Sequence, residues 1–292
     1  MPTIAQWIAG ARPRTLPAAL APVAAGTGAA AALHRADGLR AGLALVVALA
    51  LQVGVNYAND YSDGIRGTDA NRVGPFRLTG SGAARPRSVR AAAWSSFALA
   101  GGAGCALVAL CGAWWMLAVG LLCVLAAWFY TGGRRPYGYA GLGEVFVFVF
   151  FGLVAVLGTT YTQVAQVSAA AWYGAIGVGA NACALLVVNN LRDIPTDAAS
   201  GKRTLAVRLG ERGTRRLFTG LLVVSLLSIG MVARVGAPQA GLAMLSALPG
   251  FRAVRTVLGG AVGRDLVPAL QDTGRVALFY GVLVGLGVAV GA

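Results

Sequence analysis

The chain has 292 residues, of which 57% are hydrophobic and only 12% are charged, and its formal net charge is +14. Soluble domains carry about a quarter charged residues, and apolar runs of membrane-spanning length recur here from end to end. The composition therefore excludes an ordinary soluble protein and predicts an all-α, polytopic integral membrane protein. The positive charge alone would suit nucleic-acid binding, but the distribution of the basic residues argues against that function.

Nine stretches of the sequence have the length and hydropathy of transmembrane helices. In chain order they are residues 15–33, 41–59, 89–112, 114–131, 141–163, 169–190, 217–235, 237–251 and 276–292. The eighth is the weakest, because it is short and is closed by Pro249, Arg252 and Arg255, so eight spans are an alternative. The first run is not followed by a convincing cleavage site, and we interpret it as a span rather than a removed signal peptide.

The basic residues lie almost entirely on one side of these spans. Of the 24 Lys and Arg residues, only Arg35, Arg40 and Arg234 fall in loops on the side opposite to the N-terminus. By the positive-inside rule, this bias places the N-terminus and the arginine-rich loops in the cytoplasm and predicts a multi-pass protein of the plasma membrane. The charge is then a topology signal, and nucleic acid is not an expected partner.

A first acidic cluster lies where the second predicted span meets a basic loop. The stretch from Asn56 to Asp69 also contains Asp60 and Asp63, in a protein with only 10 acidic residues. If the helix continues into this stretch, Asn56, Asn59 or Asp60, and Asp63 share one face. Carboxylates gathered at a membrane boundary repel each other and are costly to desolvate, which favours a role in binding a cation.

A second acidic cluster ends the sixth predicted span. Asn189, Asp193 and Asp197 are spaced by four residues and share a helix face unless Pro195 bends the helix. Their Asn-x-x-x-Asp spacing repeats that of the first cluster, four spans later. This repetition predicts that each half of the chain delivers one acidic cluster to the same side of the membrane.

Both clusters are predicted at the cytoplasmic ends of helices 2 and 6 of a single domain, 1–292, with a possible internal repeat of 1–135 and 136–292. Facing carboxylates and amides are hard oxygen ligands that suit Mg²⁺, with Mn²⁺ as an alternative. Such an ion is commonly coordinated by the protein carboxylates and by substrate phosphates at the same time. Arginine and lysine suit phosphate oxygens, although orientation or lipid headgroup contact is the alternative for any single arginine. The basic candidates near the clusters are Arg66, Arg72, Arg77, Arg134, Arg135, Lys202 and Arg203.

A metal–phosphate site at the mouth of a helical bundle predicts a diphosphate substrate with a lipid tail. The metal and the basic residues would neutralise the leaving diphosphate, and an apolar cavity would keep water from an allylic carbocation until an aromatic acceptor attacks it. No nucleophilic side chain is needed. That agrees with the solitary His34 and with four cysteines that lie inside apolar runs without a Cys-x-x-Cys pair.

Seven short motifs occur along most of the chain in the order typical of one family. The sequence resembles the UbiA-type membrane prenyltransferases, and especially bacterial, actinobacterial members that use 1,4-dihydroxy-2-naphthoate as the acceptor. The motifs are Arg12–Pro17, Asn59–Asp69, Arg72–Arg77, Tyr130–Gly133, Gly141–Glu144, Asn189–Asp197 and Gly201–Ala206.

The resemblance implies a nine-helix bundle around a central cavity that opens laterally to lipid. It implies catalytic roles for Asp63, Asp193, Asn59 and Tyr130. Implied metal ligands are Asp63, Asp69, Asp193 and Asp197, with Asp60 at a less uniformly acidic position of the family. The implied substrate-binding residues are Asn56, Arg66, Arg72, Arg134, Arg135, Asn189, Asn190 and Lys202.

The implied reaction joins a polyprenyl diphosphate to 1,4-dihydroxy-2-naphthoate in contact with membrane lipid. Carbon dioxide and diphosphate leave, and demethylmenaquinone results after oxidation. Within the family, 4-hydroxybenzoate or homogentisate is the alternative acceptor, although the Asn-Asn-Leu-Arg-Asp and Arg-Val-Gly-Pro segments favour the naphthoate.

Two alternative functions from outside this family fit the sequence less well. The CDP-alcohol phosphotransferases open with Asp-x-x-Asp-Gly-x-x-Ala-Arg, which Asp60 to Gly64 matches, but Gly67 and Thr68 stand where Ala and Arg are needed. A secondary transporter would carry acids near mid-membrane, whereas these acids are predicted at span ends beside arginines.

Overall fold

The structure is a computed structural model of the whole chain, in which residues 2–68 and 76–291 are described. Throughout the described part of the chain, every regular element is helical, as the sequence predicted. The elements are α1 (Ile4–Ala11), η1 (Pro13–Thr15), α2 (Pro17–Ala31), α3 (Gly38–Ile65), α4 (Pro86–Cys111), α5 (Met116–Phe129), η2 (Tyr137–Ala140), α6 (Gly143–Val147), the π-helix η3 (Phe148–Val154), α7 (Ala155–Val164), α8 (Ala169–Ala199), α9 (Leu205–Arg234), η4 (Pro238–Ser246), α10 (Ala247–Leu258), η5 (Gly263–Leu266) and α11 (Val267–Val290).

Six helical segments among the described residues are long and apolar enough to cross a membrane, which indicates an integral membrane protein. They are α3, α4, the continuous α6–η3–α7 segment, α8, α9 and η5–α11. Each of the nine expected spans overlaps a helical segment. However, α2 has 15 residues, α5 has 14 and α10 has 12, against about 20 for a full crossing. The count of nine crossings therefore stays a prediction.

Several boundaries differ from those expected from hydropathy. The eighth expected span is a 3₁₀ segment, η4, followed by α10, and its helix continues past Pro249 to Leu258. α9 begins at Leu205, well before the expected span, and kinks at Gly210, where φ is +66°. α1 was not expected at all. Hydropathy detects only the apolar part of a helix, so polar helical ends and short surface helices escape it.

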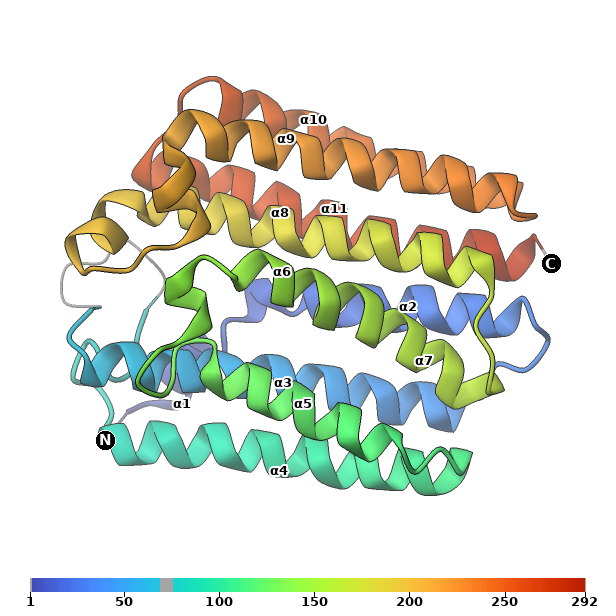
Figure 1. Ribbon diagram of the computed structural model, residues 1–292, viewed down its shortest axis with the longest axis horizontal. Coiled ribbons are helices and arrows are strands. Elements are labelled where there is room, and N and C mark those ends of the chain that lie inside the picture. Colours follow the sequence, from blue (N-terminus) through green and yellow to red (C-terminus); the bar gives the residue numbers. More distant parts are fainter. Residues whose placement is uncertain (1, 69–75, 292) are drawn as a thin grey trace.

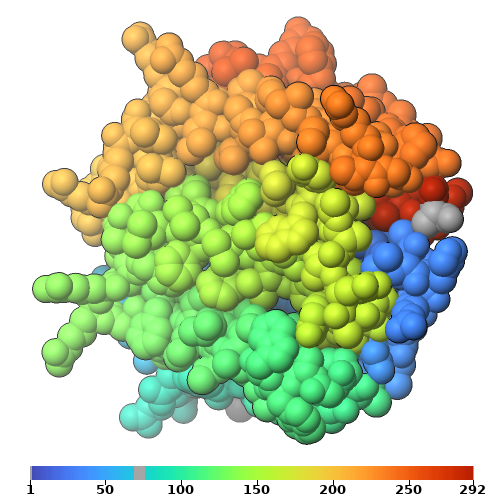
Figure 2. Space-filling view, turned by 45° about the vertical axis from the view of Figure 1, so that its right-hand side comes forward, coloured from blue at the N-terminus to red at the C-terminus, as the bar shows by residue number. Residues whose placement is uncertain are grey.

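The helices lie side by side along one common direction (Figure 1). α3 packs on α4, α2 packs on α11, and α8 packs on both α9 and α11. Small residues allow this close packing. A Cβ atom built on Gly28 of α2 would stand only 2.0 Å from the carbonyl oxygen of Gly285 in α11, so the two backbones touch, as is common between membrane helices. Figure 2 shows α9 in orange across the top of one face and the green chain of α5 to α7 across its middle.

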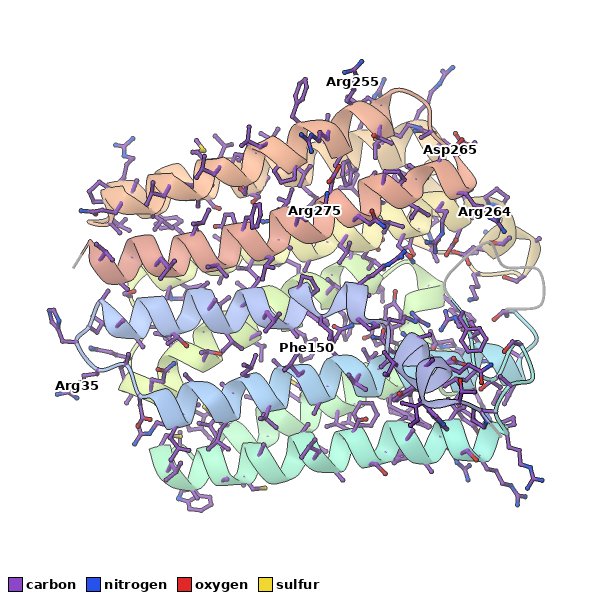
Figure 3. The ribbon with its side chains drawn as sticks, turned by 180° about the vertical axis from the view of Figure 1, so that it is seen from behind. Arg35, Phe150, Arg255, Arg264, Asp265 and Arg275 are labelled. Carbon is purple, nitrogen blue, oxygen red and sulfur yellow. The ribbon has the colours of Figure 1, made fainter. Side chains whose placement is uncertain are left out.

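The π-helix η3 interrupts one of the candidate spans. Its Gly152 contacts α8 so closely that an added Cβ atom would lie 2.6 Å from Gly179 Cα. π-turns inside helices commonly mark functional sites because they redirect neighbouring side chains. Here Phe150 and Phe151 of the π-helix line an internal cavity, and Figure 3 shows Phe150 about midway along the bundle.

Both acidic clusters reach the same end of the molecule. The C-terminal ends of α3 and α8, together with α1 and the loop that carries η2, lie at the left of Figure 1. Arg264 lies at this end and Arg35 at the opposite end (Figure 3). The helix ends thus bring together residues that are far apart in the sequence.

Candidate active site

A cavity of about 850 Å³ opens between the helices at the end where the two clusters meet. Its polar lining comes from α3, α8 and the loops that follow them. Further along the helices the lining is apolar, with residues such as Ala48, Leu51, Phe151 and Ala155. A cavity that is charged at one end and apolar at the other suits a ligand with a polar head and a hydrophobic tail.

The first cluster ends α3, and three of its side chains line the cavity. They are Asn56, Asn59 and Asp63, which recur at three- and four-residue steps on one helix face as expected. The asparagine Asn59 accepts a hydrogen bond from Thr131 Oγ1 at 2.8 Å through its amide oxygen. Its amide nitrogen therefore stays available as a donor on this face.

Asp60 lies apart from this set, and its expected role as a metal ligand stays a prediction that its contacts do not favour. Its side chain is 0% exposed and does not line the cavity. Its two oxygens accept the backbone N–H groups of Leu78 at 2.7 Å and Thr79 at 2.8 Å. These bonds engage both carboxylate oxygens and fasten the following loop to α3. The other two expected residues of this region, Asp69 and Arg72, lie outside the described residues.

Asp63 is a buried carboxylate that contacts two basic side chains and a tyrosine. It is only 2% exposed. Arg77 Nη2 lies 3.5 Å from Asp63 Oδ2, and Lys202 Nζ lies 3.4 Å from Oδ1. Tyr139 also donates a hydrogen bond to Oδ1 at 2.5 Å. Burial of a carboxylate is costly unless it is paired, and these contacts make this end of the cavity a compact polar site.

The second cluster ends α8, which continues through Pro195 to Ala199. Asn189, Asp193 and Asp197 all line the cavity, as residues on one helix face would. Arg192, which the sequence did not single out, grips Asp193 in a bidentate pair, with Nε and Nη2 each 2.8 Å from a carboxylate oxygen. Its Nη2 also donates to Asn189 Oδ1 at 2.8 Å.

Lys202 joins the two clusters. Its ammonium lies 3.4 Å from Asp63 Oδ1 and 4.0 Å from Asp197 Oδ1, and the residue is only 7% exposed. The Lys202 ammonium thus lies between carboxylates from the two halves of the chain, where it can also attract an anionic group of a ligand.

The other basic residues divide into two groups. Arg66, Arg134 and Arg135, which were expected to bind substrate, are exposed and do not line the cavity. Arg66 instead donates to the carbonyl oxygens of Thr131 and Gly133. The basic side chains that do line the cavity are Arg12, Arg14, Arg77, Arg192, Lys202 and Arg264. Arg12 and Arg14 belong to a motif noted in the sequence, whereas nothing local to Arg264 distinguished it.

Aromatic rings line one wall of the cavity. Tyr130 lines it as expected, and its ring meets Tyr137 edge-on at 5.5 Å. Tyr137 stacks on Phe146 at 4.0 Å, and Phe146 on Phe150 at 6.0 Å. The wall therefore carries π-faces from the charged end toward the apolar end, and such faces stabilise nearby positive charge.

The sequence analysis did not identify Tyr139 as a site residue, because the residues that it contacts lie far from it along the chain. Burial and the neighbouring Asp63 carboxylate raise the pKa of the Tyr139 phenol well above its ordinary value. The phenol therefore stays protonated and acts as a donor. Lys202 Nζ lies 4.7 Å from the centre of the same ring.

The last expected substrate residue, Asn190, lines the cavity and donates a hydrogen bond from Nδ2 to Glu144 Oε1 at 3.1 Å. Glu144 is buried and fixes the amide. With its nitrogen engaged in this bond, the oxygen of Asn190 is the natural group to face the cavity.

The donor set suits a hard divalent cation. Asp63, Asp193 and Asp197 supply carboxylate oxygens to one cavity. Across the described residues, no three His, Cys, Asp or Glu side chains form a ready-made metal cage. Mg²⁺ commonly binds through one or two carboxylates together with substrate phosphates, and these residues fit that mode.

Known proteins match this chain over most or all of its length. A family model described as "UbiA prenyltransferase family" matches residues 19–265. The chain is 55% identical to the 1,4-dihydroxy-2-naphthoate octaprenyltransferase of Mycobacterium tuberculosis, and the alignment covers 100% of this chain and 99% of the relative. It is 41% identical to the protein of the same name from Escherichia coli, over 77% of this chain and 75% of the relative.

Solved structures show the same fold. An apo UbiA homolog from Aeropyrum pernix aligns with a TM-score of 0.71 at 16% identity, over 94% of this chain and 97% of that one. A UbiA homolog from Archaeoglobus fulgidus bound to GPP and Mg²⁺ aligns with a TM-score of 0.71 at 15% identity, over 98% and 99% of the two chains.

Proposed function

The chain belongs to the UbiA prenyltransferase family, and we propose that it transfers a polyprenyl group from a polyprenyl diphosphate to 1,4-dihydroxy-2-naphthoate. The observation that carries this proposal is the cavity in which acidic residues of both clusters meet, charged at one end and apolar beyond. The full-length identity to relatives named for this activity supports the choice of acceptor.

The diphosphate would bind at the charged end of the cavity. Lys202, Arg77 and Arg192 line this end and would place positive charge where negative charge develops as the prenyl C–O bond breaks. Mg²⁺, or alternatively Mn²⁺, would be held by Asp63, Asp193 and Asp197 and, outside the described residues, by Asp69, and would neutralise the departing diphosphate. Asn59 and Asn189 would add amide donors beside it.

The prenyl tail would occupy the apolar part of the cavity. There the rings of Tyr130, Phe146 and Phe150 would stabilise the allylic cation through their π-faces. The apolar walls would exclude water, which would otherwise capture the cation. These residues act by shape and electrostatics, so no covalent intermediate with the protein is needed.

Carbon–carbon bond formation follows at the acceptor ring. The ring carbon that bears the carboxylate attacks C1 of the prenyl group, the electron pair of the broken C–O bond leaves with the diphosphate, and the C–CO₂ bond then breaks. The pair of electrons from that bond restores the aromatic ring. Carbon dioxide and diphosphate leave, and oxidation of the prenylated quinol gives demethylmenaquinone.

The proposal also includes the number of membrane crossings and the orientation of the chain. The chain would cross the plasma membrane nine times as a single domain in contact with lipid, with α2, α5 and the η4–α10 segment as its shorter crossings. The N-terminus and the site would face the cytoplasm. Support comes from the arginine-poor opposite end and from the matching positions of α3 and α8, each of which ends in an acidic cluster.

The test is a transfer assay with purified protein in liposomes. Radiolabelled polyprenyl diphosphate is supplied with 1,4-dihydroxy-2-naphthoate, 4-hydroxybenzoate or homogentisate, and labelled product is extracted. We expect label in the naphthoate product. Transfer to only one of the other two acids would identify that acid as the acceptor. If the protein still binds the diphosphate but transfers label to none of the three acids, the proposal is refuted.

A further inference from the structure

One hydroxyl group fixes the orientation of two amides in the cavity wall. Thr15 Oγ1 donates its only hydrogen to the carbonyl oxygen of Arg12 at 2.9 Å. Thr15 can therefore only accept from its other neighbours, which are Gln52 Nε2 and Asn56 Nδ2, each at 3.0 Å. Both amide nitrogens of α3 consequently point toward the turn that links α1 to α2.

The amide oxygens are left for another partner. Asn56 Nδ2 donates its second hydrogen to the carbonyl oxygen of Ala11 at 2.9 Å, so a flipped amide would set oxygen against oxygen at both contacts. Gln52 is only 6% exposed, and its Oε1 has no hydrogen-bond partner within the described residues. Both side chains line the cavity. A buried carbonyl group without a donor is unfavourable, which points to a ligand that supplies one.

Only one participant in the proposed reaction can supply that donor. The prenyl tail has no O–H or N–H group, and an ionised diphosphate offers only acceptor oxygens, which the amide oxygens would repel. The aromatic acceptor carries two ring hydroxyl groups. We propose that Gln52 and Asn56 form the site that recognises these hydroxyl groups, with Thr15 as the positioning residue that fixes their polarity; the proposal rests on the function proposed above.

The spacing on α3 agrees with this role. Gln52 and Asn56 are one helical turn apart on α3, and both amide nitrogens converge on Thr15 Oγ1, so the two amides are neighbours in the cavity wall. Asn56 lies two turns from Asp63 on the same cavity-lining face. The reacting carbon, next to the 1-hydroxyl, would then face the diphosphate, so Asn56 binds the 1-hydroxyl and Gln52 binds the 4-hydroxyl.

Substituting Gln52 tests the assignment, because 1-hydroxy-2-naphthoate lacks only the 4-hydroxyl group. The apparent affinity of this analogue as a competitive inhibitor is compared with the KM of the dihydroxy acceptor. We expect wild type to prefer the dihydroxy compound by about tenfold or more. In Gln52→Leu this preference should disappear, while the inhibitor affinity and the KM of the prenyl diphosphate stay the same.

Thr15 gives a second test that does not alter the amides themselves. Thr15→Val keeps the side-chain shape but removes the acceptor, so the KM of the dihydroxy acceptor should rise about tenfold. Thr15→Ser keeps the hydroxyl and should restore wild-type values. Gln163→Leu is the matched control, because Gln163 is a buried glutamine that bonds Thr27 and Asp37 and does not line this cavity.

The outcomes separate the two proposals. Equal weakening of both naphthoates in Gln52→Leu, or a rise in the KM of the prenyl diphosphate, would overturn this inference. If Gln52→Leu does not fold, unchanged acceptor kinetics in Thr15→Val would overturn it instead. Failure of wild type to prenylate any naphthoate would refute the proposed function itself.

Discussion

Tyr139 donates a hydrogen bond of 2.5 Å to Asp63, so the loop between α5 and α6 is fastened to the last turn of α3. The backbone carbonyl oxygen of Tyr139 also accepts the N–H of Arg203 at 3.0 Å. One residue therefore connects both halves of the chain at the charged end of the cavity, where the diphosphate is proposed to bind.

Tyr139→Phe removes this hydrogen bond but keeps the ring. Since the pKa of Tyr139 is raised in the folded protein, its contribution to stability is fully present below about pH 10, the ordinary value, and is lost as pH rises through the raised pKa. We expect wild type to lose thermal stability above pH 10 more steeply than Tyr139→Phe. Parallel curves of Tm against pH would contradict this prediction.

Lys202→Met removes the cation that lies between Asp63 and Asp197. A charge-assisted contact to phosphate contributes about tenfold to a hundredfold in affinity, so the KM of the prenyl diphosphate should rise by that factor. Lys202→Arg should recover part of the loss. The matched control is Arg134→Met, an exposed basic residue outside the cavity, which should leave transfer within about threefold. Equal losses in both variants would contradict the assigned positions.

Asp60 and Asp63 should respond differently to the same substitution. Asp60→Asn disturbs two bonds to backbone N–H groups, so the protein should lose about 1–3 kcal/mol of stability while the folded fraction keeps its activity. Asp63→Asn and Asp193→Asn should abolish transfer in protein that still inserts into membranes. Thermal unfolding and the transfer assay, run on the same preparations, distinguish the two effects. Wild-type turnover in either cavity variant would refute the metal assignment.

Metal removal should act through the binding of the diphosphate. EDTA is expected to stop transfer, and added Mg²⁺ or Mn²⁺ to restore it, because hard carboxylate oxygens bind these ions together with phosphate. Calorimetric titration with a prenyl diphosphate measures the same dependence without turnover. Undiminished binding and transfer after chelation would contradict a metal-bridged site.

Local patterns were sufficient to predict the class of the protein and the two clusters. Hydropathy depends on neighbouring residues, and four-residue spacing alone places Asn189, Asp193 and Asp197 on one face of a helix. The same reasoning left Asn59 and Asp60 as alternatives, because both fall close to the shared face. It also underestimated the polar ends of α9 and α11, which extend the helices beyond their apolar segments.

The sequence by itself determined that this chain is a helical membrane protein with two acidic clusters of matching spacing, because segment hydropathy and helical periodicity are local properties. Only the tertiary structure decided that Asp63 faces the cavity while Asp60 fastens a loop, that Lys202 rather than Arg134 lies between the carboxylates, and that Thr15 orients Gln52. The physical reason is that each of these outcomes depends on contacts between segments that lie far apart in the sequence and meet only when the helices pack.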